Sequence, residues 1–572
     1  MTSRTRAIAG LLAAAIALMP TAGSAQGFAG AYLAATSANI NNDYEEAVTY
    51  YVRALARDPE NRTLLRNALI AMIAAGQFNE AERVAAGLAS IAPQSQIAAL
   101  TALALSLRSG DFEKAAEIAE NDDFRFNPLM QGLVAAWAEV GRGNYDAAVT
   151  AFDALDQNDT LLSYARAHKA LALALVGDYA AAADVFEAET GAIPHVNRSA
   201  VLTHVSSLSQ SARIDRALEV AERALSDGFS DPELEAARDR LAQGEAVAFD
   251  VIASPAEGAA TAFSLISSAL FRDQSERLSL IYARLSTLIW PDYEEGRVLV
   301  AEVLQSQGQY DLAIEEFAKI APTSGWYISA EIGRAEALQR MGAPERAIEV
   351  LASLSREIPD ELTVLTALGD AYRNQEEFLD AEEAYTRAFD LIDVERPSHW
   401  LLYFHRGIVR ERSDQWDLAE ADFRRALELE PSQPHVLNYL GYSLVELRRN
   451  LDEALAMIEE AVAQRPEDGY ITDSLGWVLY RLGRFEEAVP HMERAVELTP
   501  VDPIINDHLG DVLWKVGRKL EAEFQWRRAL SFEPEDDDAV RIRRKLEVGL
   551  DVVLEEEDEA SAVVPPTASD AQ

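Results

Sequence analysis

Most of the chain has the periodicity of amphipathic helices. In residues 473–500, for example, Leu475, Val478, Leu479 and Leu482 recur at the i, i+3, i+4, i+7 spacing that places apolar side chains on one face of a helix. No segment shows a convincing strand pattern, in which polar and apolar residues alternate. The pattern predicts an all-α protein.

The helical segments repeat with a period of about 34 residues. Five of them share the form Gly-x-aromatic-x-x-Ala: Gly76–Ala81, Gly110–Ala115, Gly177–Ala182, Gly308–Ala313 and Gly483–Ala488. Their alanines belong to a longer series: Ala47, Ala81, Ala115, Ala148, Ala182, Ala217, Ala313, Ala347, Ala381, Ala419, Ala454, Ala488 and Ala522. A second series follows many of these alanines by 12 residues: Pro59, Pro93, Pro194, Pro359, Pro431, Pro466, Pro500 and Pro534. Two series in one register indicate a repeated structural unit.

Each unit resembles the tetratricopeptide repeat (TPR), a helix-turn-helix motif of 34 residues. The resemblance implies an α-solenoid, a right-handed superhelix of stacked repeats, with about 13 clear units and a degenerate middle. Glycine after a first helix tolerates the positive φ of the turn. Glycines on first helices should let the two helices of a unit cross closely, opposite the alanines of second helices: Gly369, Gly407, Gly476 and Gly510 opposite Ala381, Ala419, Ala488 and Ala522.

The repeats predict the domain organisation. Residues 1–25 have a basic start, an apolar run too short to span a bilayer and small residues at 23 and 25, as in a cleavable signal peptide. We expect an N-terminal TPR array over 26–226, a degenerate helical connector and candidate hinge over 227–296, and a C-terminal array over 297–534. A capping helix over 535–550 and a disordered acidic tail over 551–572 should follow.

Composition excludes several classes of function. The formal net charge is −44, so a nucleic-acid backbone would be repelled. The absence of cysteine excludes disulfides, thiolate metal sites and lipid attachment at an N-terminal cysteine. The sequence contains no HExxH pair, phosphate-binding loop, nucleophile elbow or dinucleotide fingerprint. We therefore expect no enzyme, no cofactor and no metal. We also expect a periplasmic protein without stable membrane insertion, with a peripheral place at the outer membrane as an option.

What remains is a surface for other proteins. In TPR proteins one face of the first helices lines a concave groove that holds peptides, where aromatic and Arg side chains favour binding. Mapping this face onto the last four units selects eleven residues: Phe404, Arg412, Asn438, Tyr442, Asp473, Trp477, Tyr480, Arg481, Asn506, Trp514 and Lys515. Asn438, Asp473 and Asn506 are expected to form a polar ladder along the groove. The alternative for each large aromatic is ordinary packing between repeats.

Residues 435–534 show a closer resemblance. They are similar to the C-terminal units of a family of bacterial envelope TPR proteins that includes LbcA, the lipoprotein partner of the carboxyl-terminal processing protease CtpA. The resemblance implies a non-enzymatic adaptor that brings cell-wall hydrolase substrates to a periplasmic protease. This sequence departs from the family because it has no lipidation cysteine. The alternative is a structural subunit of an envelope assembly or export complex, for polysaccharide or outer-membrane biogenesis. An enzyme would need a catalytic site within 227–296.

Overall fold

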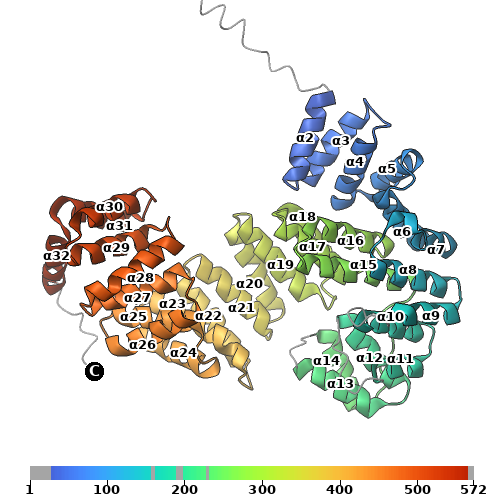
Figure 1. Ribbon diagram of the computed structural model, residues 1–572. Helices are drawn as coiled ribbons and strands as arrows, with labels where there is room; N and C mark the ends of the chain where they lie inside the picture. Colours follow the sequence, from blue (N-terminus) through green and yellow to red (C-terminus); the bar gives the residue numbers. More distant parts are fainter. Residues whose placement is uncertain (1–27, 156–161, 188–196, 227–230, 564–572) are drawn as a thin grey trace, which may run out of the picture. The chain divides into compact units, whose positions relative to one another are not determined.

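The computed structural model describes residues 28–155, 162–187, 197–226 and 231–563. Over these residues the chain forms 31 α-helices and two short 3-10 helices, and no strand (Figure 1). The all-α prediction is confirmed, whereas the expected signal peptide lies outside the described residues. The chain divides into two compact units, Met1–Leu354 and Ser355–Gln572, with the boundary inside α20 (Pro344–Glu357).

The first unit begins with six pairs of packed helices. They are α2 (Phe28–Ile40) with α3 (Tyr44–Leu55), α4 (Arg62–Ala74) with α5 (Phe78–Ile91), α6 (Gln96–Ser109) with α7 (Phe112–Ala119), α8 (Pro128–Gly141) with α9 (Tyr145–Leu155), α10 (Leu162–Leu175) with α11 (Tyr179–Glu187), and α12 (Arg198–Gln210) with α13 (Ile214–Ser226). The short η1 (Asp122–Phe124) precedes α8. The remaining helices are α14 (Pro232–Ala242), α15 (Pro255–Arg272), α16 (Glu276–Ile289), α17 (Glu294–Ser306), α18 (Tyr310–Phe317), α19 (Tyr327–Arg340) and α20.

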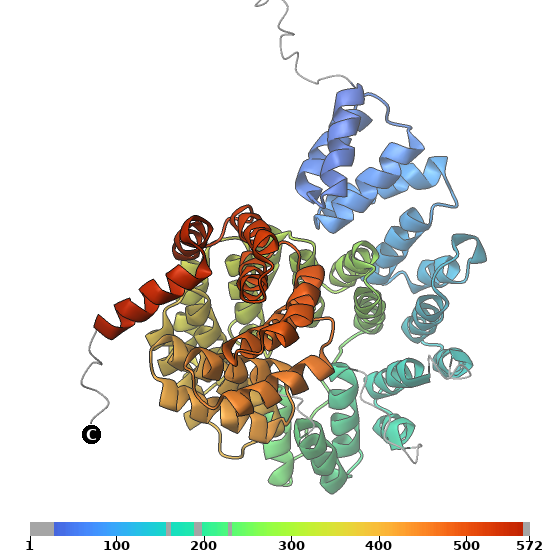
Figure 2. The same cartoon turned by 60° about the vertical axis from the view of Figure 1, so that its left-hand side comes forward.

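The second unit is also built from pairs, drawn from yellow to red in Figure 2. They are α21 (Leu362–Asn374) with α22 (Phe378–Asp390), α23 (Trp400–Arg412) with α24 (Trp416–Leu429), α25 (Pro434–Glu446) with α26 (Leu451–Gln464), α27 (Gly469–Arg481) with α28 (Phe485–Leu498), α29 (Pro503–Lys515) with α30 (Lys519–Leu530), and α31 (Asp536–Val548) with α32 (Leu550–Val563). The short η2 (Pro397–His399) leads into α23.

The repeated glycines serve two purposes. In the turns between paired helices, Gly76 and Gly483 have φ of +74° and +75°, a backbone conformation that costs glycine little. Within first helices, glycine leaves space for a large side chain of the second helix. An added Cβ at Gly476 would lie 2.7 Å from Met492, and one at Gly510 would lie 2.4 Å from Trp526.

The same relation holds for three other crossings of the second unit. The side chains that fill the space beside the glycine are Tyr385 at Gly369, Phe423 at Gly407 and Ile458 at Gly441. Tyr385 and Phe423 are each four residues beyond the alanine that the sequence predicted opposite the glycine, so the large residue one turn further along the second helix fills this space. The prediction of a close crossing is confirmed, and its main contact is corrected.

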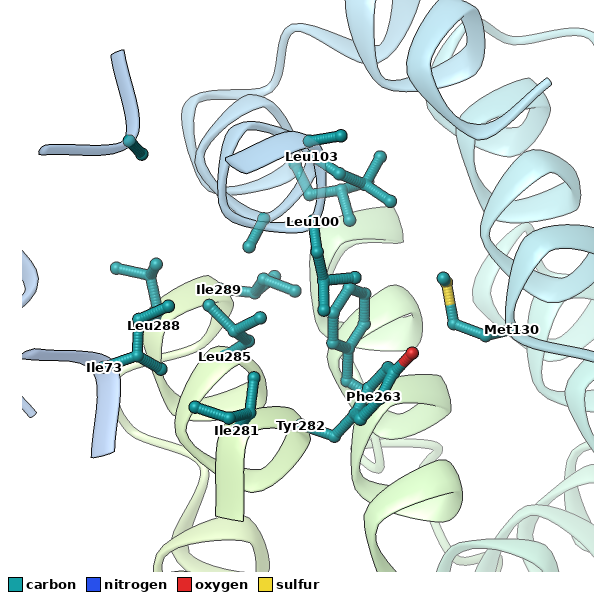
Figure 3. Packing of buried hydrophobic residues seen from close by; sticks show 14 of the residues in the cluster. Ile73, Leu100, Leu103, Met130, Phe263, Ile281, Tyr282, Leu285, Leu288 and Ile289 are labelled. Atoms are coloured by element: carbon teal, nitrogen blue, oxygen red, sulfur yellow. The ribbon is translucent and has the colours of Figure 1, made fainter. Parts of the chain in front are cut away.

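The described part of the expected degenerate connector, residues 231–296, is helical and packs against the N-terminal array. Their helices α15 and α16 form a hairpin that packs against α8 and α10 and against α4 and α6, respectively. In Figure 3, Phe263 and Tyr282 of this hairpin lie among Leu100 of α6 and Met130 of α8. The hairpin thus covers the first helices α4, α6, α8 and α10 of the N-terminal array. In the predicted solenoid, these helices line the groove. Because these contacts are buried and apolar, this segment is part of the core of the first unit.

Polar contacts hold α16 and α17 against the first two helix pairs. The buried Arg284 donates from Nε to the carbonyl oxygen of Ala74 at 3.0 Å and from Nη1 to Glu316 at 2.6 Å. Tyr44 donates its hydroxyl proton to Gln307 Oε1 at 2.6 Å. Although burial raises the pKa of Glu316, the cations Arg284 and Lys319 outweigh it and lower that pKa to about 2. Glu316 is therefore ionised at neutral pH and paired.

The C-terminal end also differs from the expectation. The capping helix is present as α31, but residues up to Val563 continue as α32, in place of a tail disordered from residue 551. Arg541 and Arg544 of α31 bond to Glu557 and Glu556 of α32 at 2.7 and 2.6 Å. Glu556 and Glu557 of the predicted disordered tail are thus paired with basic residues of α31. The rest of the predicted tail, 564–572, lies outside the described residues.

The packing of α15 on α8 can be tested with Gly258→Ala. An added Cβ at Gly258 would lie 2.4 Å from the buried ring of Trp137. We expect a loss of about 1–3 kcal/mol in the free energy of unfolding, measured by urea denaturation, because overpacking outweighs the better helix propensity of alanine. Gly87→Ala in α5 is the control, since its Cβ would meet only Leu65 at 3.9 Å. Equal stability of the two variants would contradict this packing.

Candidate functional site

The eleven sequence-selected residues all lie on four first helices of the second unit, α23, α25, α27 and α29. Local sequence explains where these helices begin. Asp468 caps α27 by accepting hydrogen bonds from the backbone N–H groups of Tyr470 and Ile471. Asp502 caps α29 in the same way through Ile505, and proline occupies the first turns of α25 and α29. The sequence therefore locates the helices well, and the structure decides which side chains are accessible.

The aromatic residues of α27 are packed inside the unit. Trp477 is 7% exposed and Tyr480 is 9% exposed. The Trp477 ring stacks on His508 at a centroid distance of 3.9 Å and on Tyr480 at 4.8 Å. Its Nε1–H donates to Glu446 Oε1 at 2.6 Å. With both faces and its only donor engaged, Trp477 joins neighbouring repeats and offers little to a ligand.

Asp473 is also engaged inside the unit. Its Oδ2 lies 2.9 Å from Nδ1 of His508, and both side chains are buried. Burial of the imidazole opposes its protonation, but Asp473 and the nearby Asp507 and Asp511 outweigh it, so the pKa of His508 is raised. One member of the predicted ladder, Asp473, thus forms a buried ion pair with His508 that joins α27 to α29.

The third member of the predicted ladder is wrong by one residue. Asn506 donates to the carbonyl oxygens of Pro500 and Asp502 at 3.3 and 2.6 Å, so it reinforces the start of its own helix. Asp507 stands three residues before Gly510, as Asn438 and Asp473 stand before Gly441 and Gly476. It is therefore Asp507 that occupies the equivalent position.

Sequence reasoning missed a buried cation beside this position. Lys545 of α31 is 1% exposed, and its Nζ donates to Asp507 Oδ2 and Asp511 Oδ1, both at 2.7 Å. Trp526 also donates to Asp511, at 2.9 Å. Burial and Asp511 raise the pKa of Asp507 to about 6, against the opposing effect of Lys545. The available signal was a lysine at an apolar-face position of the predicted capping helix.

The residues at the ends of α27 and α29 are partly accessible. Arg481 lies 3.6 Å from Glu446. Trp514 Nε1 and Lys515 Nζ donate to Asp551 of α32 at 2.9 and 2.7 Å. The start of α32 therefore engages the polar atoms of two residues that the sequence assigned to a ligand.

The remaining four residues of the predicted site are also accessible in part. Phe404 and Arg412 of α23 and Asn438 and Tyr442 of α25 define what we call the α23–α25 surface. Phe404, Asn438 and Tyr442 are half-buried, and the Arg412 side chain is 62% exposed. The Oδ1 atom of Asn438 is buried and accepts no hydrogen bond from any described residue. This surface combines aromatic area, a cation and unused hydrogen-bonding capacity.

The described residues offer no arrangement for metal chemistry. Among them, no group of three or more His, Asp or Glu side chains could hold a metal ion. Nor does any described helix have both the length and the apolar character needed to cross a bilayer. The chemistry that the site supports is recognition by packing, charge and hydrogen bonding.

The paired helices, the small residues at their crossings and the glycine turns define a helical-repeat solenoid. Family models of the tetratricopeptide repeat match residues 38–104, 133–196, 332–393, 366–434, 404–469 and 440–503. These segments together cover more than half of the chain and include α23, α25 and α27. The chain belongs to the tetratricopeptide repeat family.

Similar proteins share only part of their length with this chain. TPR repeat-containing protein PA4667 of Pseudomonas aeruginosa is 27% identical over 175 residues, which are 30% of this chain and 28% of that protein. Human tetratricopeptide repeat protein 13 is 30% identical over 179 residues, which are 30% of this chain and 20% of that protein. The chain thus spans less than a third of either relative.

Two solved structures are similar at a low level. A tetratricopeptide repeat protein from Parabacteroides merdae is 16% identical with a TM-score of 0.37, covering 45% of this chain and 98% of that one. A chain of the APC/C hetero-tetramer Cut9–Hcn1 is 14% identical with a TM-score of 0.38, covering 91% of this chain and 95% of that one. The family assignment therefore rests on the repeat models and on the helix pairs themselves.

The buried His508–Asp473 pair predicts a pH dependence of stability in the second unit. Because the folded-state pKa of His508 lies above 6.5, its contribution is complete below about pH 6.5 and is lost as the pH rises through the raised pKa. Asp507 acts in the same direction at lower pH, since its pKa rises from 3.8 to about 6 on folding. We expect the protection of α27 and α29 amides against hydrogen exchange, corrected for intrinsic rates, to fall as the pH rises above about 6.5.

Two histidine variants test whether the His508–Asp473 pair causes this pH dependence. His508→Gln should flatten the fall in protection, whereas His435→Gln, at an exposed position on α25, should leave it unchanged. The same slope in His508→Gln and in the unsubstituted chain would show that this pair does not set the pH dependence.

Proposed function

We propose that this protein is a non-enzymatic scaffold that binds other proteins through the α23–α25 surface. The observation that carries the proposal is the buried, unpartnered Oδ1 of Asn438 beside the half-buried Phe404 and Tyr442. A buried polar atom without a partner costs free energy, which a hydrogen bond from a bound polypeptide would remove once the half-buried side chain of Asn438 rotates toward the surface. Aromatic residues and Arg412 supply the contact types found at the centres of protein interfaces.

The partner of this scaffold, on the proposal, is a carboxyl-terminal processing protease, to which the scaffold brings cell-wall hydrolase substrates. The support is the resemblance of residues 435–534 to the envelope adaptor family described above. Helices α25 to α29, which carry most of the selected residues, belong to this stretch. Trp477, Tyr480 and Asp473 would then support the binding surface from inside.

The proposed location is the periplasm. Its support is the sequence of residues 1–25, with Arg4 and Arg6 before an apolar run and small residues at 23 and 25. Fractionation of cells that produce the full chain should recover a shortened protein in the periplasmic fraction. Recovery of the full-length chain in the cytosol would contradict this location.

Affinity capture from envelope extract tests the binding surface. We expect Asn438→Ala combined with Tyr442→Ala to lower the recovery of the bound protease roughly tenfold, since two central contacts of an interface are worth about 1–2 kcal/mol or more. Mass spectrometry identifies the captured proteins and measures their amounts.

The control is Asn374→Ala combined with Tyr470→Ala, which removes the same side-chain types at exposed positions of the same unit. Equal capture by the two double variants would remove the α23–α25 surface from the proposal. Capture of a stoichiometric export or assembly complex without a protease would support the alternative function.

A further inference from the structure

The first unit contains a cavity of about 580 Å³ between α4, α6 and α16. Its volume lies in the range of pockets that enclose ligands of several dozen atoms. The floor is apolar, with Ile70 of α4, Leu100 of α6 and Ile281 of α16. Helices α15 and α16 together are called the central hairpin below. Leu278 at its edge is 48% exposed. The central hairpin thus forms one wall of the cavity.

The side chains that line the cavity are positively charged, whereas the net charge of the whole protein is negative. The chain has 95 acidic and 51 basic side chains, yet the described lining includes Arg62, Arg66 and Arg277 and no carboxylate. Glu276 adjoins Arg277 in sequence but does not line the cavity. An acidic protein therefore carries a local cationic pocket, in which an anion would be attracted and a cation repelled.

The two arginines in the first turns of α4 destabilise this helix when no anion is bound. Arg62 and Arg66 are exposed, lie one turn apart and form no ion pair with any described residue. Like charges at this spacing repel each other, and positive charge in the first turns of a helix opposes the helix dipole. The first turn of α4 has no acidic residue to offset them. A bound carboxylate would remove both penalties.

The third arginine is held in place without losing its charge. Arg277 donates from Nη2 to the carbonyl oxygens of Asn39 and Ile40, each at 2.8 Å, and from Nε to Asn42 Oδ1 at 3.1 Å. All three acceptors are neutral, so the guanidinium stays a net cation at the cavity edge.

Helix ends add to the positive potential. The starts of α4 and α6 and the capping residue Asn127 of α8 all line the cavity. Ser95, which precedes α6, makes no side-chain cap, so backbone N–H groups of its first turn have no side-chain acceptor there. Three helix N-termini thus contribute partial positive charge to one pocket.

We infer that this cavity binds an acidic segment of a partner polypeptide, with carboxylate side chains at Arg62 and Arg66 and an apolar side chain on the floor formed by Ile70, Leu100 and Ile281. Guanidinium groups bind carboxylates through paired hydrogen bonds, and the exposed Leu278 extends the apolar contact. The site is independent of the α23–α25 surface, because it lies in the other unit and uses charge where that surface uses aromatic packing.

Fluorescence polarisation with the full chain tests the inference. The probe is a labelled hexapeptide of alternating leucine and glutamate with an amidated C-terminus, compared with its leucine–glutamine counterpart. We expect the glutamate peptide to bind at least roughly tenfold more tightly, and salt to weaken its binding. Equal binding of the amidated peptides, or no binding of the glutamate peptide at about 1 mM, overturns the inference.

Matched variants locate the binding. Arg62→Gln combined with Arg66→Gln should weaken binding of the glutamate peptide roughly tenfold, whereas Arg57→Gln combined with Arg340→Gln makes the same change in net charge at exposed positions outside the cavity. Equal affinities of these two variants would place any binding elsewhere. Asn438→Ala combined with Tyr442→Ala should leave peptide binding intact, so failure of either site is distinguishable from failure of the other.

Discussion

The structure depends on one steric constraint, the close crossing of two helices at a glycine. In each crossing of the second unit from Gly369 to Gly510, a large side chain of the following helix fills the volume that a Cβ would need. The energy of such contacts is dispersion and apolar burial, both of which require close approach. Because the constraint recurs with the repeat, the two helices of each of these pairs approach closely at the glycine.

In the first unit, the central hairpin covers the first helices of the N-terminal array. It therefore limits where this unit can bind a partner. Helices α15 and α16 place Phe263 and Tyr282 against first helices that would otherwise face solvent. A peptide cannot displace this core without exposing large apolar area, so recognition in this unit is limited to the space the hairpin leaves. One such space is the cationic cavity, which owes one of its arginines, Arg277, to the hairpin itself.

Sequence patterns predicted the parts of this structure that local rules control. Helix type, the repeat and the glycine turns at Gly76 or Gly483 depend on residues a few positions apart. The state of the selected side chains depends on residues from neighbouring repeats: Trp477 is covered by His508 and bonded to Glu446, each 31 residues away. The central hairpin lacked the repeat residues altogether, so its packing on α4 to α10 had no signal in the periodicity.

The buried Lys545 shows how a solenoid can fix the position of its last helix. Replacing a buried ion pair by apolar residues often costs little stability, so the contact of Lys545 with Asp507 and Asp511 is weak evidence for stabilisation. Removing Lys545 alone would cost more, because the two buried carboxylates would keep only the more distant Arg541 as a cationic partner, at 3.6 and 3.5 Å. If α31 slid by one turn along α29, the lysine would leave both carboxylates while apolar contacts could be replaced by similar ones. The ion pair therefore selects one register for the cap, and this register brings Asp551 to Trp514 and Lys515.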